Sequence, residues 1–157
     1  IRCDVPIFLA RQLGKHQVGM SWNEVSRRYV SDNFDFFDTE GGWRAKPNKS
    51  IKQGSAGLLP EESQVLVNDL YENVLDTAMG AYDTMLAEGV APEQARMVLP
   101  QSMMTQYIWT GSLMAFAHVY NLRAEGHAQK EAQDFAIALD KIIRPLFPVS
   151  WSELTGH

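Results

Sequence analysis

The sequence predicts an α/β (α+β) fold, with a small sheet at the front and helices in the second half. Short segments of β-type residues near the N-terminus predict the strands. Long stretches with apolar residues at helical spacing after Pro60 predict the helices. A chain of 157 residues is long enough for one core, so we expect residues 1–157 to form one domain.

The front part alternates between short elements and turns. We expect a strand over Ile1–Val5, then a helix over Ile7–Leu13 that begins after Pro6 and ends at Gly14. Asn23–Val30 is predicted to be extended with a bend, and Phe34–Phe37 to be a further strand. Residues 38–57 are rich in Gly, Lys, Asn and Ser, which indicates a long loop of functional or irregular character.

The second half predicts four helices. A long helix begins at Pro60 and ends at Gly89, and a short one covers Glu93–Val98. Ser102–Leu122 is predicted to be a third helix, and its apolar residues on all sides suggest burial or a subunit interface. The fourth covers Ala128–Leu146 and is closed by prolines.

Composition narrows the classes of function. A net charge of −5 argues against a protein that binds duplex nucleic acid, because such proteins present a strongly basic face. No apolar run reaches the ~20 residues that span a bilayer, so we expect no membrane partner. The single cysteine suits a reducing cytoplasm. Because the chain opens at Ile1 without methionine, we expect that an upstream segment of the fold is missing.

Positive charge is concentrated between Lys15 and Tyr29 in an otherwise acidic protein. Lys15, His16, Arg27 and Arg28 lie in this stretch. Arginine and lysine donate charge-assisted hydrogen bonds to phosphate oxygens. The stretch therefore predicts a site for an anion, with phosphate as the leading candidate.

The order of residues around this stretch resembles a signature of the flavin-dependent thymidylate synthases. That family carries Arg-His-Arg, seven or eight residues and then Ser, usually with Asn-Glu before and Arg-Tyr after. Lys15-His16-Gln17 and Asn23-Glu24-Val25-Ser26-Arg27-Arg28-Tyr29 follow this order. A second block also resembles the family: Ala95–Pro100, Thr105, Thr110, Asn121-Leu122-Arg123 and His127-Ala128-Gln129.

The resemblance implies reductive methylation of deoxyuridine monophosphate (dUMP) to thymidine monophosphate (dTMP). FAD would be the cofactor, with NADPH and methylenetetrahydrofolate as co-substrates. The family fold is an α/β domain in a homotetramer whose active sites are shared between subunits. Partners would thus be dUMP, a folate and a nicotinamide cofactor.

The resemblance also implies roles for individual residues. Arg123 matches the arginine that contacts the uracil ring, and a fixed cation there would stabilise charge that develops during the reaction. The other positions implied to bind dUMP are Gln12, Lys15, Glu24, Val25, Ser26, Arg27, Arg28 and Arg96. Those implied to bind FAD are Lys15, His16, Gln17, Glu24, Ser112 and His118.

Several positions depart from the family pattern and lower the positive charge near the expected flavin. Lys and Gln replace the two arginines of Arg-His-Arg, and Met114 stands where the family usually has Arg. Ser112 and His118 stand where Asn is usual. We expect Arg44, Lys46, Lys49 and Lys52 to be candidates for the missing cofactor contacts.

Two other functions stay open at this point. A catalytically silent nucleotide-binding or assembly module would keep the nucleotide residues and lose the flavin. A helical scaffold protein would carry the motifs by coincidence, and Arg123 would then be a solvated charge at a helix end. No metal is expected, because the histidines and the one cysteine lack the spacing of a zinc site.

Overall fold

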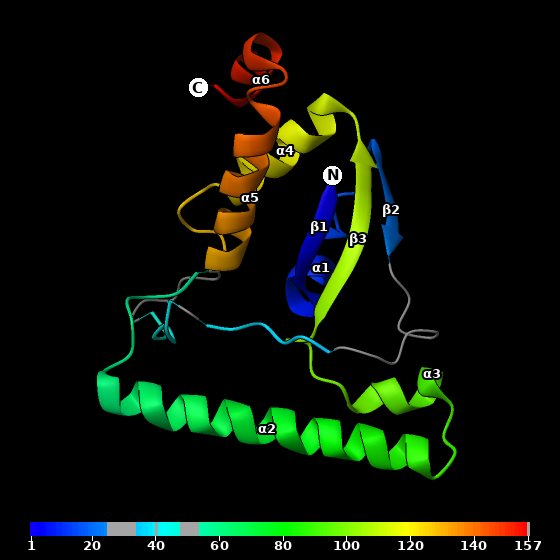
Figure 1. Cartoon of the computed structure of the whole chain (residues 1–157). Helices are drawn as coiled ribbons and strands as arrows, with labels where there is room; N and C mark the ends of the chain where they lie inside the picture. The colour runs from blue at the N-terminus through cyan, green and yellow to red at the C-terminus, as the bar shows by residue number, and fades with distance from the viewer. Residues whose placement is uncertain (25–33, 40, 48–53, 157) are drawn as a thin grey trace.

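The computed structural model describes residues 1–24, 34–39, 41–47 and 54–156. Three antiparallel strands form a sheet in the order β1-β3-β2, with β3 in the centre (Figure 1). The strands are β1 (Arg2–Pro6), β2 (Met20–Glu24) and β3 (Met104–Gly111). The predicted small sheet and the helical second half are both confirmed.

The sheet has one buried and one exposed face, because strand side chains alternate. On β3, Thr105, Tyr107 and Trp109 are buried, and on β1 the same holds for Cys3 and Val5. Residues of the opposite face are hydrophilic or exposed. On this face, Arg2 Nη2 donates a hydrogen bond to Gln106 Oε1, and Gln106 Nε2 donates one to Asp4 Oδ2. This is the usual pattern of an antiparallel sheet that covers a core on one side.

The prediction of one helix over Ser102–Leu122 was wrong. The segment forms β3 and then α4 (Leu113–Arg123), with the break at Gly111 and Ser112. Ser112 Oγ accepts a hydrogen bond from the backbone N–H of Ala115 and so caps α4. The strand half is rich in Thr, Tyr, Ile and Trp, which favour pleated, half-buried positions over helix. Because most of the segment is apolar, the change from the two-residue spacing of a strand to the helical spacing of α4 is obscured in the sequence.

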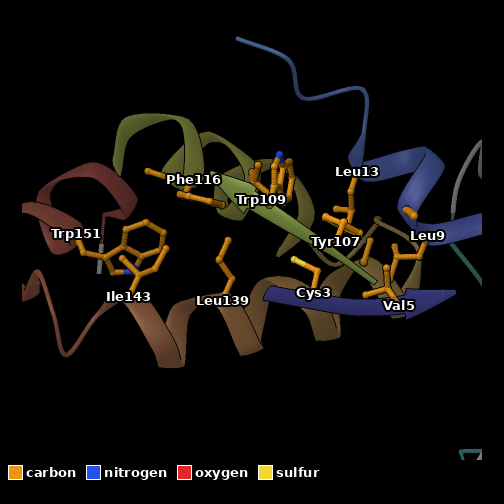
Figure 2. Packing of buried hydrophobic residues seen from close by; sticks show 14 residues of the cluster. Cys3, Val5, Leu9, Leu13, Tyr107, Trp109, Phe116, Leu139, Ile143 and Trp151 are labelled. Atoms are coloured by element: carbon orange, nitrogen blue, oxygen red, sulfur yellow. The ribbon is translucent and has the colours of Figure 1, made fainter. Parts of the chain in front are cut away.

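Helices cover the buried face of the sheet. α1 (Ile7–Leu13) follows β1 directly, as predicted, and α4 packs against α5 (Lys130–Ile143) and α6 (Pro148–Thr155). Figure 2 shows the shared core, which extends from Trp109 on the sheet past Phe116 and Leu139 to Trp151 among the helices. The fully buried Trp151 donates from Nε1 to Asp140 Oδ1 at 2.7 Å, which joins α6 to α5.

The helix predicted over Ala128–Leu146 is confirmed in its central part, but α6 was not predicted. Pro148, one of the prolines expected to close this helix, instead occupies the first turn of a new one. Proline suits that position because its missing N–H would have no partner there. The sequence pattern alone therefore assigned Pro148 to the end of the helix before it, whereas it belongs to the start of α6.

The longest helix lies apart from the sheet. α2 (Glu61–Ala87) crosses one end of the molecule, and α3 (Pro92–Ala95) with the 3-10 turn η1 (Arg96–Val98) packs on it (Figure 1). These elements agree with the helices predicted from Pro60 to Gly89 and over Glu93–Val98. Edge-to-face contacts join α2 to the preceding segment, with Tyr82 on Phe34 and Tyr71 on Trp43.

The strand predicted over Phe34–Phe37 is reduced to one isolated bridge between Phe36 and Met103. Two backbone hydrogen bonds flank it, from Phe37 N–H to Ser102 C=O and from Met104 N–H to Asp35 C=O. The described part of the predicted Asn23–Val30 segment is extended, because β2 ends at Glu24. Residues 25–30 lie outside the described ranges.

Candidate active site

A cleft of about 450 Å³ opens between α1, β2 and the loop that joins them. Cavities of this size suit small organic ligands. Its walls are mostly apolar, with a few polar side chains, a composition that is typical of ligand sites. The lining residues are Ile7, Ala10, Arg11, Gly14, His16, Gln17, Met20, Trp22, Glu24 and Trp109.

Aromatic rings form the wall on the sheet side. Trp22 of β2 stacks on Tyr107 of β3 with ring centroids 3.4 Å apart, and it meets Trp109 edge to face at 5.7 Å. The rings come together because residues on one face of neighbouring strands lie opposite or diagonal to one another. The Trp22 ring, inclined at 67° to Trp109, offers a planar aromatic surface that suits a heterocyclic ligand.

Glu24 supplies a carboxylate to this cleft. Thr105 Oγ1, on the central strand, donates a 2.6 Å hydrogen bond to Glu24 Oε1. Thr105 is only 3% exposed, so its hydroxyl is held firmly by the surrounding core. Since a carboxylate has several acceptor sites, Glu24 can accept further hydrogen bonds from a ligand.

Arg123 and His16 meet beside the cleft although they are far apart in the sequence. Arg123 is the last residue of α4, and its Nε donates a 3.1 Å hydrogen bond to His16 Nε2. Burial lowers the pKa of His16, and the nearby Arg123 and His118 lower this pKa further. Burial also lowers the pKa of Arg123, but arginine stays protonated in proteins.

Three further predicted residues lie close to this pair or to the cleft. Gln17 is part of the cleft lining, and His118 is near enough to His16 to affect its pKa. Ser112 lies beside Gly19, where an added Cβ would come within 3.2 Å of Ser112 Oγ. Gly19 has φ of +72°, a conformation that glycine adopts without strain. The tight turn therefore brings the loop against the start of α4.

Gln12 has an unusual polar atom. Its Oε1 is buried and has no hydrogen-bond partner in the described part of the chain. Buried polar atoms normally find a partner, since an unsatisfied one costs about 1–3 kcal/mol. A ligand that donates to Gln12 would remove that cost.

Other predicted residues are not brought into the cleft. Lys15 is exposed, and Arg96 lies on η1 against α2, where its Nε donates to the backbone C=O of Glu93. Among the described residues, Glu24 and Arg123 at or beside the cleft are thus separate from Arg96 on η1. Val25, Ser26, Arg27 and Arg28 lie outside the described residues, and their roles stay predictions.

Arg44 has a partner within the chain. Its guanidinium pairs with Glu131 and its Nε donates to Ser55 Oγ at 2.8 Å. Arg44 borders a second cavity of about 680 Å³ between the segment 36–44 and the start of α5. Its charge is thus largely compensated, which weakens the expectation that it replaces missing flavin contacts. Lys46 is exposed, and Lys49 and Lys52 lie outside the described residues.

The sequence-based prediction missed the roles of Thr105 and the aromatic wall. Thr105 belongs to the second motif block, but a helix prediction for Ser102–Leu122 hid its pairing with β2. The alternation of Thr105, Tyr107 and Trp109 was the signal that could have identified a strand. The contact of Trp22 with Tyr107 could be predicted only with the register of β2 against β3, and the sequence alone does not define that register.

The described residues contain no group of three or more potential metal-ligating side chains. None of their helices combines the length and apolar character that crossing a membrane requires.

The small sheet with a helical layer on its buried face has a counterpart among solved structures. A crystal structure of a UMP/dUMP methylase from Streptomyces cacaoi, bound with 5-Br UMP, has this fold, with a TM-score of 0.87 and 26% sequence identity. The match covers 99% of this chain and 72% of that one.

The chain belongs to the thymidylate synthase complementing protein family, whose model matches residues 1–149. A flavin-dependent thymidylate synthase of Thermus thermophilus is 36% identical over 153 residues, which are 97% of this chain and 54% of the relative. One from Kosmotoga olearia is 36% identical over 148 residues, covering 94% and 63% respectively. The chain thus spans only about half to two thirds of these relatives' length.

The cleft fits the ring part of a flavin. The Trp22 ring on its sheet side suits a planar ring system, and His16, Gln17 and Glu24 are the polar side chains of the lining that could bind one. Fewer cations are available to bind the cofactor's phosphates, because the uncharged Met114 stands where the family usually has Arg. The Met114 side chain is half exposed. Arg11 and Lys15 are the cations of α1 and the following loop, and Arg11 lines the cleft.

Proposed function

We propose that the chain is the catalytic region of a flavin-dependent thymidylate synthase, which methylates dUMP reductively to dTMP. The observation that carries the proposal is that Glu24 and His16 line one aromatic cleft, with Arg123 hydrogen-bonded to His16 beside it, in a member of this family. These side chains come from a strand, a loop and the end of a helix. Without this fold they would be separated along the chain.

Each group has a defined task in this proposal. Arg123 contacts the uracil ring and stabilises the negative charge that develops on it. Gln12 accepts a hydrogen bond at its buried Oε1. Ser26, Arg28 and Arg96 bind the phosphate side of dUMP, with Lys15, Val25 and Arg27 beside it.

FAD, reduced by NADPH, would supply the hydride, and methylenetetrahydrofolate the carbon. Glu24, His16 and Gln17 would border the flavin ring, with Ser112, His118 and Lys15 beyond them. Trp22 and Trp109 exclude water from one side of the cleft. Exclusion of water strengthens the electrostatic effect of Arg123 on bound substrate.

Assembly into a homotetramer belongs to the same proposal. Arg96 lies on η1, apart from the cleft, so a complete dUMP site would combine residues of different copies. α2 also carries a row of exposed apolar side chains, Leu66, Leu70 and Val74, that are 56–61% exposed in the single chain. Large exposed apolar surfaces often mark sites of protein association.

A direct assay tests the function. The full chain with FAD, NADPH and methylenetetrahydrofolate should release tritium from dUMP labelled at C5 and form dTMP. UMP is assayed in parallel, because the structural neighbour is a methylase of both UMP and dUMP. Turnover of UMP alone would overturn the proposed substrate.

The catalytically silent module remains the second candidate. The observation that favours it is the loss of cations at Gln17 and Met114. A protein that binds dUMP in calorimetry, stays colourless in excess FAD and forms no dTMP would support this module. A protein that binds neither dUMP nor FAD would exclude both candidate functions.

A further inference from the structure

His16 lies between a tryptophan ring and a guanidinium group. The imidazole meets Trp109 edge to face, with ring centroids 6.5 Å apart. On another side, Nε2 lies 3.1 Å from Arg123 Nε. The contact ties the loop after α1 to the last turn of α4, across 107 positions of sequence. His16 is half-buried, so this position is set by the fold.

The direction of this hydrogen bond fixes the protonation state of His16. Arginine Nε–H can only donate, so His16 Nε2 must provide a lone pair. The proton of the neutral ring therefore lies on Nδ1. A doubly protonated imidazolium has no acceptor, and it would place a second positive charge against Arg123.

We propose that neutral His16 is a positioning residue that orients the Arg123 guanidinium toward the substrate, and that protonation of His16 releases it. The inference rests on the proposed function of Arg123 and adds a regulation of that site by pH. A bond at Nε fixes the plane of the guanidinium, and the two Nη groups then point in defined directions. The Nδ1–H of His16 stays able to donate to the cofactor.

The charges around His16 favour its neutral form. Arg123 and His118 of α4 lower its pKa, after the larger effect of burial. Arg11 of α1 and Glu24 of β2 also line the cleft that His16 borders, and Lys15 precedes it in the loop. Within the described part of the chain, these cationic groups outnumber the Glu24 carboxylate, so we expect the switch to operate below the ordinary pKa of histidine.

Variants of His16 that remove the hydrogen-bond acceptor Nε2 distinguish the positioning role of His16 from a role in packing alone. H16F keeps an aromatic ring beside Trp109 but cannot accept a hydrogen bond. H16Q can still accept one through Oε1 and cannot titrate. The control is H127Q, because His127 is exposed and lies outside the cleft.

The first measurement is kcat and KM for dUMP between about pH 5 and pH 8, where histidine changes its charge. For H16F, kcat should fall roughly ten- to hundredfold, the rate equivalent of one hydrogen bond to a charged group. H16Q should recover most of kcat and lose the decline on the acid side. H127Q should keep the parent profile. A parent-like kcat in H16F, or an unchanged acid decline in H16Q, would overturn the proposal.

The second measurement needs no turnover. Nitrogen-15 NMR of the flavin-loaded full chain should show His16 with its proton on Nδ1 at neutral pH. The Arg123 Nε–H signal should shift as His16 titrates, and this shift should vanish in H16Q. An Nε2–H tautomer, or an Arg123 signal that ignores His16, would overturn the positioning role. If these signals appear as expected but no dTMP forms, only the proposed function fails.

Discussion

At the residue scale, Thr105 and Glu24 show how the fold prepares a polar group for chemistry. Thr105 is buried in the centre of the sheet, so its hydroxyl has little freedom, and it holds one oxygen of Glu24. A carboxylate with one fixed oxygen presents the other in a narrow range of directions. Glu24 is thereby oriented before any ligand binds, which lowers the entropy that binding must lose.

Replacement of Thr105 tests this orientation. T105V keeps the shape of the side chain and removes the hydroxyl, whereas T105S keeps the hydroxyl as the matched control. We expect kcat/KM of T105V for dUMP to fall about ten- to hundredfold, because a hydrogen bond to a charged group is lost. T105S should stay near the parent value. Equal losses in both variants would indicate a packing effect instead.

A second residue-scale prediction concerns Glu131. Burial raises the pKa of its carboxyl group. Hydrogen bonds from Arg44, its own backbone N–H and Gln129 lower it, as does the charge of Arg44, and together they outweigh burial. The net effect is a pKa below the ordinary value of 4.5. The folded state then binds fewer protons than the unfolded state near this pH. The pair therefore stabilises the fold above about pH 4.5, and this contribution disappears as pH falls through the lowered pKa.

The variant R44M should lose about 1–3 kcal/mol at neutral pH, because it leaves a half-buried carboxylate with fewer partners. The loss should shrink toward acid pH, where Glu131 is protonated in both forms. Urea unfolding of the parent and R44M at several pH values measures this difference. E131Q is the control, and its stability should depend less on pH than that of the parent. A constant difference at all pH values would contradict the assigned pair.

At the element scale, the start of α4 explains one departure from the family pattern. Ser112 stands where Asn is usual, and its side chain caps the helix. Serine and asparagine are both strong N-cap residues, since each places an oxygen near the free N–H groups. The change therefore preserves the helix start and alters only what the side chain offers to a ligand.

The variant S112A should destabilise the protein by about 1 kcal/mol, the usual cost of a lost cap. S112N should retain the parent stability, because asparagine replaces the cap. Chemical unfolding of the three proteins measures both values. An S112A variant as stable as the parent would show that the first turn of α4 is held by packing alone.

Elements differ in how much the sequence could predict. Short elements bounded by Pro or Gly, such as β1 and α1, were predicted because the boundary residues act locally. β3 and α4 merge into one apolar run, so their boundary depends on the pairing of Thr105, Tyr107 and Trp109 with other strands. α6 depends on burial of Trp151 beneath α4 and α5, a contact that no local pattern reveals.

The same limit applies to the candidate site. The motif could indicate His16, Glu24 and Arg123 as site residues, because each stands at a characteristic position. It could not indicate that His16 and Arg123 bond to each other, since their contact depends on the packing of α4 beside the α1 loop. Sequence patterns identify residue types, whereas tertiary packing decides their partners.

At the scale of the whole molecule, α2 presents apolar residues on two sides. Tyr71 and Tyr82 contact Trp43 and Phe34 of the same chain, and Leu66, Leu70 and Val74 follow one another every four residues about a quarter to a third of a turn away. A helix with apolar residues on both sides is usually covered on both. We therefore expect a second copy to cover the exposed row.

Introduction of a charge into this row should block assembly. L70E places a carboxylate among apolar side chains, and burial of that charge is unfavourable. We expect a smaller oligomer in light scattering and a loss of dUMP methylation, because the proposed dUMP site takes Arg96 from another copy. Asp76→Lys, a charge change away from the row, should leave the size unchanged. A parent-sized L70E oligomer would exclude this face as the interface.

The stacked rings of the cleft also give the protein a built-in optical signal. Trp22 lies almost parallel to Tyr107, at 15°, and Trp109 adjoins both. Ring pairs this close couple their electronic transitions, so this corner of the molecule contributes a signal to near-ultraviolet circular dichroism. A flavin or pyrimidine that enters the cleft would join the coupled rings and change that spectrum. Occupancy can thus be followed without a label, even in variants that have lost turnover.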